Sequence, residues 1–475
     1  MLAAKYLGTV TALVATAVIA RFATPAEVGV VATALSIMAI ARCLEEFGLG
    51  DAVVQRAELE TGQVTVLFWI NAAMGLALGA VFATAAAPIA GFFGQTELVP
   101  IIVALSLTFP FGALGGMHRA LLRRSFRFRS LAAANAIATI AGSAAGIAIA
   151  VAGGGAWALV GQTLVNSLTH LVGCWVASGW RPGLPQRGTE VRPMLRFGIH
   201  LAAANFLGQA TRNIDNILIA KFVGPAAVGV YDRAFQLMLL PMSHFNQPFN
   251  TAVVPALSRL QHDPEAYRRL YRKLNGVLAS ISFPIAVFLG VAAPAIVATL
   301  YGPAWSESAT LLRLLAPCGL LLSLNGSIGW AFTSLGRTGR QVRWTVIASA
   351  VSIAGIVAGL PWGAAGVAVG LSAARILLRI PSLIYCYRGT FLRLDDLWRV
   401  TWPPVLASTM GGVLAFLVDP VEAPAAMRLA IQLAVFLPAY AIALRWLPGG
   451  RDRFAGFRTE LAGWRRPRTP GPLDR

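Results

Sequence analysis

The basic residues of this chain are gathered in every second loop between long apolar segments, along its whole length of 475 residues. Arginine-rich loops alternate with loops that carry almost no Lys or Arg. A bilayer core about 30 Å thick requires roughly 20 apolar residues per crossing, and basic loops stay on the cytoplasmic side because they resist translocation. The pattern therefore predicts an all-α polytopic membrane protein and gives the direction of each crossing.

The composition supports this prediction and argues against a large soluble domain. Hydrophobic residues make up 57% of the chain and charged residues only 12%, whereas soluble domains carry about 25% charged residues. The net charge of +19 is concentrated in the basic loops, so we do not expect nucleic acid as a partner. The four cysteines lie far apart in or beside apolar segments, and no HExxH, GxSxG, Walker A or CxxC motif occurs, so the sequence predicts no metal, no cofactor and no enzyme.

The apolar segments predict about 14 transmembrane helices, with both termini in the cytoplasm. The first apolar run continues to Phe22 without a cleavage signal, so we expect it to remain as the first helix. The predicted spans are 6–22, 28–47, 64–88, 99–117, 131–152, 157–178, 197–222, 228–250, 275–300, 309–333, 344–360, 365–385, 401–418 and 428–447.

An internal repeat divides the chain. Residues 19–30 (IARFATPAEVGV) return at 219–230 as IAKFVGPAAVGV, and a weaker similarity joins 154–161 to 363–370. The repeat predicts two bundles of about six helices each, an arrangement typical of transporters. The predicted divisions are residues 1–180 and 197–390 for the two bundles, 181–196 for a cytoplasmic linker, 391–447 for two additional transmembrane helices and 448–475 for a basic cytoplasmic tail.

The repeat also bears on the start of the chain. It aligns residue 1 with residue 201, so the first predicted helix has no counterpart of the residues that come before 201 in and beside the predicted helix 197–222. We expect either a short first helix or a true start upstream of Met1.

The predicted helix 197–222 carries a polar stripe. Asn205, Gln209, Arg212 and Asn216 fall within an arc of about 60° on a helix. Asp215 lies at its edge and can pair with Arg212. Charges inside a bilayer face a water-filled cavity or a partner rather than lipid. The stripe therefore predicts either a substrate cavity or an ion pair that joins helices.

The predicted helix 228–250 carries a second stripe that begins with Asp232 and Gln236, and Arg233 flanks it. Two helices of one hairpin with narrow polar faces predict a shared aqueous cavity. Asp215 and Asp232 are the candidates for coupling to a proton or a sodium ion, because burial moves a carboxylate pKa toward neutrality. Pro241 is expected to kink this helix.

A charged group stands near the end of the predicted helix 28–47. Arg42, Glu45 and Glu46 share one face just before Gly48, a residue type that commonly ends helices. This pattern predicts either an interfacial salt bridge or a gate.

A basic loop follows at 119–129 (RALLRRSFRFR) and interleaves arginine with Leu and Phe. Two explanations fit this loop. Its arginines could simply keep it on the cytoplasmic side, or Arg123, Arg124 and Arg127 could attract an anionic lipid diphosphate.

Five segments in order resemble the polysaccharide transporter family, which comprises Wzx-type and colanic-acid-type oligosaccharide flippases of the multidrug/oligosaccharidyl-lipid/polysaccharide exporter superfamily. The segments are 119–130 (RALLRRSFRFRS), 155–162 (GAWALVGQ), 212–224 (RNIDNILIAKFVG), 229–241 (GVYDRAFQLMLLP) and 253–261 (VVPALSRLQ).

The resemblance implies a bacterial inner-membrane flippase that moves undecaprenyl-diphosphate-linked oligosaccharide units by alternating access, for exopolysaccharide, capsule or O-antigen synthesis. It also implies membrane lipids, a polysaccharide polymerase and a chain-length regulator as partners. Charge recognition would depend mainly on Arg212 and Arg233, because the first span has no charge between Lys5 and Arg21.

Two other functions stay open at this point. The same fold could export another lipid precursor or drugs, although a drug pump is expected to have an acidic or aromatic cavity. A membrane glycan polymerase or ligase would need catalytic groups on a sizeable outer loop, and the outer loops here are short.

Overall fold

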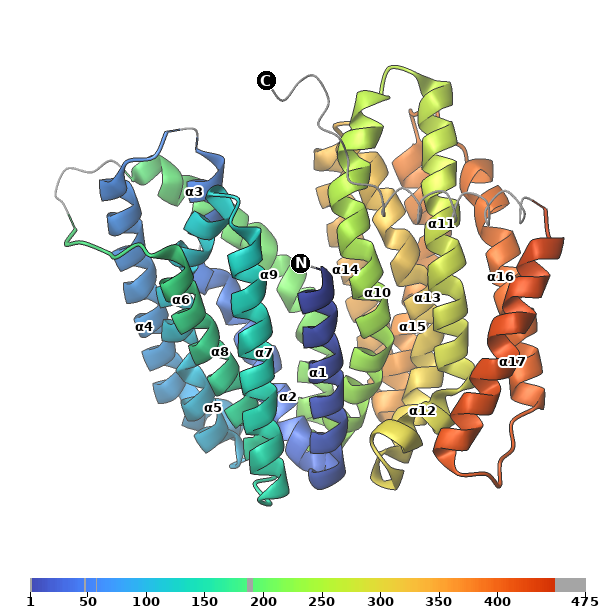
Figure 1. Cartoon of the computed structure of the whole chain (residues 1–475), viewed down its shortest axis with the longest axis horizontal. Coiled ribbons are helices and arrows are strands. Elements are labelled where there is room, and N and C mark those ends of the chain that lie inside the picture. Colours follow the sequence, from blue (N-terminus) through green and yellow to red (C-terminus); the bar gives the residue numbers. More distant parts are fainter. Residues whose placement is uncertain (1, 47, 57, 186–190, 449–475) are drawn as a thin grey trace. The chain divides into compact units, whose positions relative to one another are not determined.

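The computed structural model describes residues 2–46, 48–56, 58–185 and 191–448, and the described part of the chain is built from helices (Figure 1). The α-helices are α1 (Leu2–Phe22), α2 (Pro25–Glu46), α3 (Leu49–Gln55), α4 (Thr61–Phe93), α5 (Leu98–Ser106), α6 (Thr108–Arg124), α7 (Phe128–Val151), α8 (Trp157–Ser178), α9 (Arg192–Phe222), α10 (Pro225–Arg259), α11 (Pro264–Val291), α12 (Ala293–Leu300), α13 (Ser306–Ser334), α14 (Thr338–Gly359), α15 (Gly363–Tyr387), α16 (Leu394–Leu417) and α17 (Ala425–Trp446).

The helices follow the apolar segments, which confirms the predicted class of an all-α polytopic membrane protein. Nine segments of the described chain are long and apolar enough to cross a membrane, whereas the figure of about 14 crossings remains a prediction. The predicted span 99–117 lies within one apolar segment, Leu98–Arg124, in which a turn at Leu107 separates α5 from α6. The short helix α3 was not predicted; it follows Gly48, whose φ of 58° ends α2.

The chain packs as two compact units. The first unit comprises Met1–Asp232, Leu300–Trp305 and Leu360–Ala364, and the second comprises Arg233–Thr299, Ser306–Gly359 and Ala365–Arg475. The first unit thus extends through α9, beyond the predicted linker at 181–196. The division into two repeated bundles, a linker, two additional helices and a tail remains a prediction.

The repeat around residues 19–30 and 219–230 has a physical counterpart within the first unit. Gly29 of α2 lies against the carbonyl oxygen of Pro225, and Gly229 of α10 lies against the carbonyl oxygen of Pro25, so that a Cβ at either glycine would overlap that oxygen. The two helix starts therefore cross in a reciprocal backbone contact that only glycine permits.

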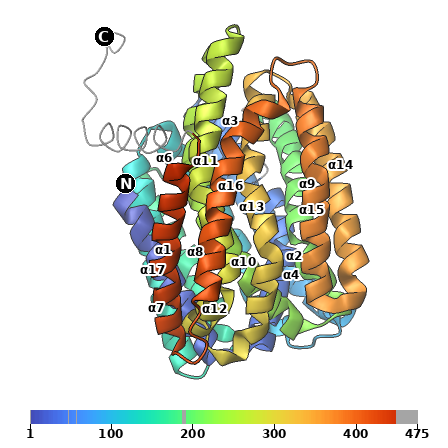
Figure 2. The same ribbon diagram turned by 90° about the vertical axis from the view of Figure 1, so that its right-hand side faces the viewer.

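Helix packing within each unit uses small residues. In the first unit α7 packs on α8 and α1, and α2 packs on α9. Gly142 of α7 lies so close to α8 that a Cβ would stand 2.7 Å from the Gln162 carbonyl oxygen. In the second unit α16 packs on α11 and α17, and Figure 2 shows α16 beside α17. Such close approach is how helices associate in lipid, where no hydrophobic force drives them together.

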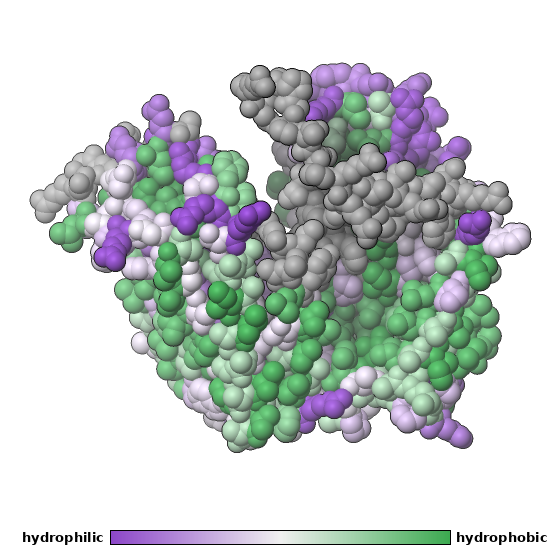
Figure 3. All heavy atoms as spheres, in the orientation of Figure 1, coloured by the Kyte–Doolittle hydropathy of each residue, from purple (hydrophilic) through white to green (hydrophobic). Residues whose placement is uncertain are grey.

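The surface agrees with a bilayer environment. Large apolar side chains are exposed on the helix flanks, for example Leu377 of α15 and Leu417 of α16. Figure 3 shows hydrophobic residues along the sides of the helices, whereas hydrophilic residues gather at their ends. Together with the apolar segments, this makes the chain a multi-pass membrane protein.

Candidate functional site

The stripe predicted on 197–222 lies on α9, and its charged residue, Arg212, is exposed. Arg212 Nε donates a hydrogen bond to Gln209 Oε1 at 2.9 Å. Within the described residues Arg212 forms no ion pair with Asp215 or Asp232, so the predicted Arg212–Asp215 pairing is not formed in this structure. The side chain of Asn205 lies outside the described residues.

Asp215 turns instead toward α10. Its side chain is 4% exposed, and it accepts a hydrogen bond from the Tyr231 hydroxyl at 2.9 Å. Tyr231 is itself fully buried. A carboxylate of this kind is held by tertiary packing, since its partner lies on the next helix rather than one turn away.

Asn216 extends this contact to a third helix. Its Nδ2 donates to Ser36 Oγ of α2 at 3.0 Å and reaches Asp232 Oδ1 of α10 at 3.4 Å. Its Oδ1 is buried without a hydrogen-bond partner in the described part of the chain. We call Ser36, Asp215, Asn216, Tyr231 and Asp232 the three-helix polar cluster. Its carboxylate and amide oxygens are the groups that take a proton or a hard cation.

Three members of this cluster, Asp215, Asn216 and Asp232, were predicted as site residues, and two were not. Ser36 is a small residue in an apolar helix, and Tyr231 lies near the start of α10, so neither stood out. No group of three or more His, Cys, Asp or Glu side chains able to hold a metal occurs in the described residues. The other predicted residues of α10 are less enclosed: Gln236 is exposed, and Arg233 is half-buried.

The group predicted as a gate lies on α2, and its two described side chains, Arg42 and Glu45, both contact α6. Arg42 Nη2 donates to Thr108 Oγ1 of α6 at 3.2 Å. Glu45 is 4% exposed, and its carboxylate lies against Gly112, where a Cβ would overlap it. The side chain of Glu46 lies outside the described residues.

Two arginines of the predicted basic loop fasten α3. Arg123 forms an ion pair with Asp51 at 2.7 Å, and Arg124 donates to the carbonyl oxygens of Val53 and Arg56. Arg127 is exposed beside the first turn of α7. A structural role of Arg123 and Arg124 was not predicted, and the attraction of a lipid diphosphate remains a prediction.

A cavity of about 320 Å³ lies inside the first unit, between α2, α6, α7 and α8. No single segment of the sequence indicates this cavity, because its walls come from four helices that are separate in the sequence. The residues that line it are Arg42, Glu45, Thr108, Phe111, Gly112, Arg119, Arg123, Leu131, Asn135, Asn166, Ser167 and His170. We call this the first-unit cavity.

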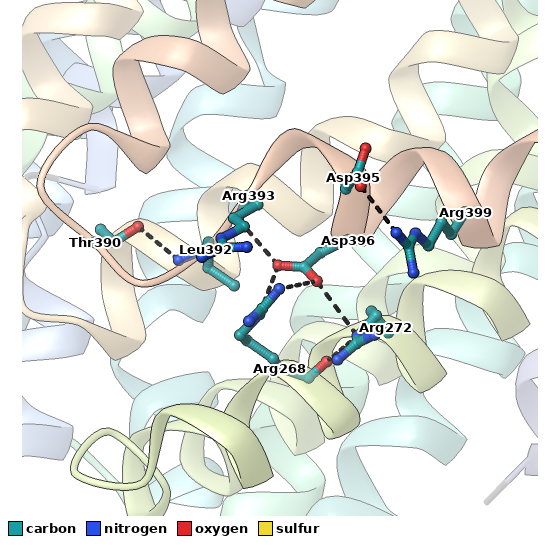
Figure 4. A network of polar contacts seen from close by, with 8 residues as sticks. All are labelled: Arg268, Arg272, Thr390, Leu392, Arg393, Asp395, Asp396 and Arg399. Carbon is teal, nitrogen blue, oxygen red and sulfur yellow. Dashed lines mark hydrogen bonds and ion pairs between the residues drawn. The ribbon is translucent and has the colours of Figure 1, made fainter.

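A closed ionic network stands in the second unit (Figure 4). Asp396, near the start of α16, accepts two hydrogen bonds from Arg268 of α11, each of 2.9 Å. Arg272 approaches the same carboxylate at 3.4 Å, and the backbone N–H of Arg393 donates to it at 3.0 Å. All four contacts converge on a side chain that is 2% exposed.

The family model described as "Polysaccharide biosynthesis protein" matches residues 18–310. The chain belongs to this family. The match spans α2 to α12 entirely, including the three-helix polar cluster and the first-unit cavity, and it confirms the resemblance drawn from the sequence.

Relatives and solved structures agree with the membership. The chain is 28% identical over 377 residues to the lipopolysaccharide biosynthesis protein WzxC of Escherichia coli, which covers 79% of this chain and 76% of that protein. It is 26% identical over 354 residues to the succinoglycan biosynthesis transport protein ExoT of Rhizobium meliloti, with 72% and 69% covered. The lipid II flippase MurJ, in an inward closed conformation, shares the fold with a TM-score of 0.76 and 15% identity, covering 93% of this chain and 98% of that one.

Proposed function

We propose that this member of the polysaccharide biosynthesis family is a flippase that moves a lipid-linked oligosaccharide, carried on undecaprenyl diphosphate, from the cytoplasmic to the outer leaflet of the bacterial inner membrane. The family match over residues 18–310 of a multi-pass membrane chain carries the proposal. A relative named as a transport protein and a fold shared with a flippase support transport rather than catalysis.

The proposed mechanism is alternating access. Arg212 and Arg233 would neutralise the diphosphate, while the amides of Asn205, Gln209, Asn216 and Gln236 would hydrogen-bond sugar hydroxyls. The exposure of Arg212 and its hydrogen bond to the neutral amide of Gln209 support this role, because Arg212 forms no ion pair within the described residues. The lipid tail would remain in the bilayer.

Coupling to an ion gradient is assigned to the three-helix polar cluster. Asp215 is buried against Tyr231, so a proton or sodium ion arriving there would change the contact between α9 and α10. A bistable contact of this kind lets a small ligand shift a conformational equilibrium. Arg42, Glu45 and Glu46 remain a proposed gate at the end of α2.

We also propose that both termini are cytoplasmic and that a polymerase and a chain-length regulator receive the product. Reporter fusions test the orientation: fusions after Arg129 or Arg269 should report the cytoplasm, and fusions near Gln95 or Asp419 the periplasm. A periplasmic signal after Arg129 would overturn the topology without touching the fold.

The decisive experiment is translocation in proteoliposomes that contain the purified full-length protein and a fluorescent undecaprenyl-diphosphate oligosaccharide. We expect protein-dependent flipping that Arg212→Ala abolishes and Arg212→Lys partly restores, since an ammonium lacks the fork that matches a diphosphate. Normal flipping by Arg212→Ala at equal reconstitution would remove Arg212 from the mechanism. Efflux of cationic dyes with no flipping of the lipid would contradict the proposed substrate.

A further inference from the structure

The chemistry of the first-unit cavity is that of an anion site. Three guanidinium groups, from Arg42, Arg119 and Arg123, and the imidazole of His170 stand around one hollow, and among the described lining residues one carboxylate, that of Glu45, opposes them. Clefts lined mainly by one sign of charge concentrate ligands of the opposite sign. Asn135, Asn166, Thr108 and Ser167 add neutral hydrogen-bonding groups to the same walls.

We propose that the first-unit cavity binds the diphosphate headgroup of the lipid-linked substrate, separately from the stripe on α9. This inference rests on the proposed flippase function for the identity of the ligand, but not for the existence of an anion site. Arginine is the residue that best matches phosphate oxygens, because its planar fork donates two parallel hydrogen bonds.

Arg42 and Arg123 differ in the partners that their guanidinium groups have. Among the side chains that the structure describes, Arg42 has a neutral partner, the hydroxyl of Thr108 at 3.2 Å. Arg123 is already engaged with Asp51 at 2.7 Å, and both of these side chains are about half exposed. Arg42 is therefore the cation with most to gain from an anion, and Arg123 the one with least.

The volume of the first-unit cavity, about 320 Å³, lies at the lower end of the range for small-ligand sites, about 300–1,000 Å³. A diphosphate group of about nine heavy atoms fits such a space.

The weaker repeat places comparable hydrogen-bonding side chains in the second unit. A shift of 209 residues takes Gly154 to Gly363 and carries Ser178 to Tyr387, the last residues of α8 and α15. The same shift places Arg375 and Arg379 at the positions of Asn166 and His170. Hydrogen-bonding side chains one turn apart thus occur at the same register in both repeats. Arg375 Nε is buried and lacks a hydrogen-bond partner in the described part of the chain.

The test measures binding rather than transport. Full-length protein in nanodiscs is titrated with undecaprenyl diphosphate, and inorganic diphosphate is added as a competitor. We expect Arg42→Gln and His170→Gln each to weaken binding by about tenfold, since a hydrogen bond to a charged group contributes about 1.5–3 kcal/mol. Both variants should keep the thermal unfolding midpoint of the unchanged protein.

Arg129→Gln is the matched control, because it removes the same charge from an exposed position of α7 that does not line the cavity. Its affinity should stay within about twofold of the unchanged protein. Equal affinity in Arg42→Gln, His170→Gln and Arg129→Gln would overturn the proposal, as would equal losses in all three, which would mean non-specific attraction to the basic surface.

Two competition measurements distinguish the carrier headgroup from a bilayer lipid as the source of the bound phosphate. Competition by inorganic diphosphate, with no effect of raising phosphatidylglycerol in the nanodisc, supports the carrier headgroup. Displacement by phosphatidylglycerol alone would assign the cavity to a bilayer lipid and overturn the proposal. Flipping that fails in proteoliposomes while cavity-dependent binding persists would contradict the flippase function and leave the anion site standing.

Discussion

Two arginine clusters in this protein have opposite surroundings. In the second unit Arg268 and Arg272 close on Asp396, whose carboxylate accepts side-chain and backbone hydrogen bonds and is 2% exposed. In the first unit Arg42 donates to a hydroxyl at the wall of a cavity of about 320 Å³. The donors of the second-unit arginines meet a buried carboxylate, whereas the partner of Arg42 among the described side chains of the first unit is a neutral hydroxyl.

The difference shows why arginine in a membrane protein cannot be interpreted from its loop alone. The alternation of basic loops explains the presence of both clusters equally well. A guanidinium with a buried acid contributes to stability, because removing the acid leaves an uncompensated charge. A guanidinium beside a cavity with only a neutral partner has hydrogen-bonding capacity left for a ligand. The partner, and not the charge pattern, separates the two roles.

The largest effect on stability is expected from Asp396→Asn. The amide removes the charge that Arg268 and Arg272 share, and we expect a loss of about 2–3 kcal/mol of unfolding free energy. The partial exposure of both arginines keeps the loss at this level, since water compensates part of their charge. Thermal unfolding in detergent measures it. Diphosphate binding by the folded fraction should not change, and a selective loss of binding would contradict the assignment of this cluster to stability.

Hydropathy predicted the helices because a segment in lipid must be apolar and must satisfy its backbone hydrogen bonds within itself. Both requirements can be recognised in a short stretch of sequence. The predicted span 157–178 therefore coincides with α8. The turn between α5 and α6 has a local cause, because Pro110 cannot donate a hydrogen bond to the carbonyl of Ser106. The short helix α3 depends on packing instead, since Arg123 and Arg124 hold it in place from α6.

The candidate site was predicted in part for the same reason. Helical periodicity brought Asp215, Asn216 and Asp232 onto facing stripes, and the structure joins them through Asn216. Spacing along one helix also allowed an ion pair between Arg212 and Asp215 as an alternative to a cavity stripe, whereas in the structure Asp215 accepts a hydrogen bond from Tyr231 of the neighbouring helix. The first-unit cavity, built from four helices, has no signature in any single segment.

Asp215→Asn is expected to have an intermediate effect. The amide oxygen can still accept from the Tyr231 hydroxyl, so we expect a loss of about 1 kcal/mol in unfolding free energy. Substrate binding should persist, but flipping should no longer respond to an imposed ion gradient. Tyr231→Phe is the control, because it removes the hydrogen bond to Asp215 and retains the carboxylate. If gradient-driven flipping continued unchanged in Asp215→Asn and in the double variant with Asp232→Asn, these carboxylates would be structural only.

Arg123→Gln tests a residue that has both kinds of surroundings, because Arg123 lines the first-unit cavity and also pairs with an acid, Asp51. Both side chains of the pair are about half exposed, so we expect a loss below about 1 kcal/mol in unfolding free energy. Undecaprenyl diphosphate should bind more weakly by only about twofold to threefold, less than for Arg42→Gln. A larger loss of affinity than that of Arg42→Gln would reverse the order inferred from their partners.

The smallest effect is expected from Asp395→Asn, the neighbour of the residue with the largest. Asp395 pairs with Arg399 at 3.1 Å, one turn along α16, and the two side chains are 65% and 69% exposed. Water solvates both charges before and after the substitution, and exposed pairs at this spacing contribute about 0.3–0.5 kcal/mol at most. The same chemical change at adjacent positions thus isolates burial as the variable. Unfolding midpoints measured side by side for Asp395→Asn and Asp396→Asn should differ by several degrees. Equal midpoints would mean that the bidentate contact with Arg268 stabilises no more than a surface pair, and the contrast between the closed cluster and the first-unit cavity would lose its energetic basis.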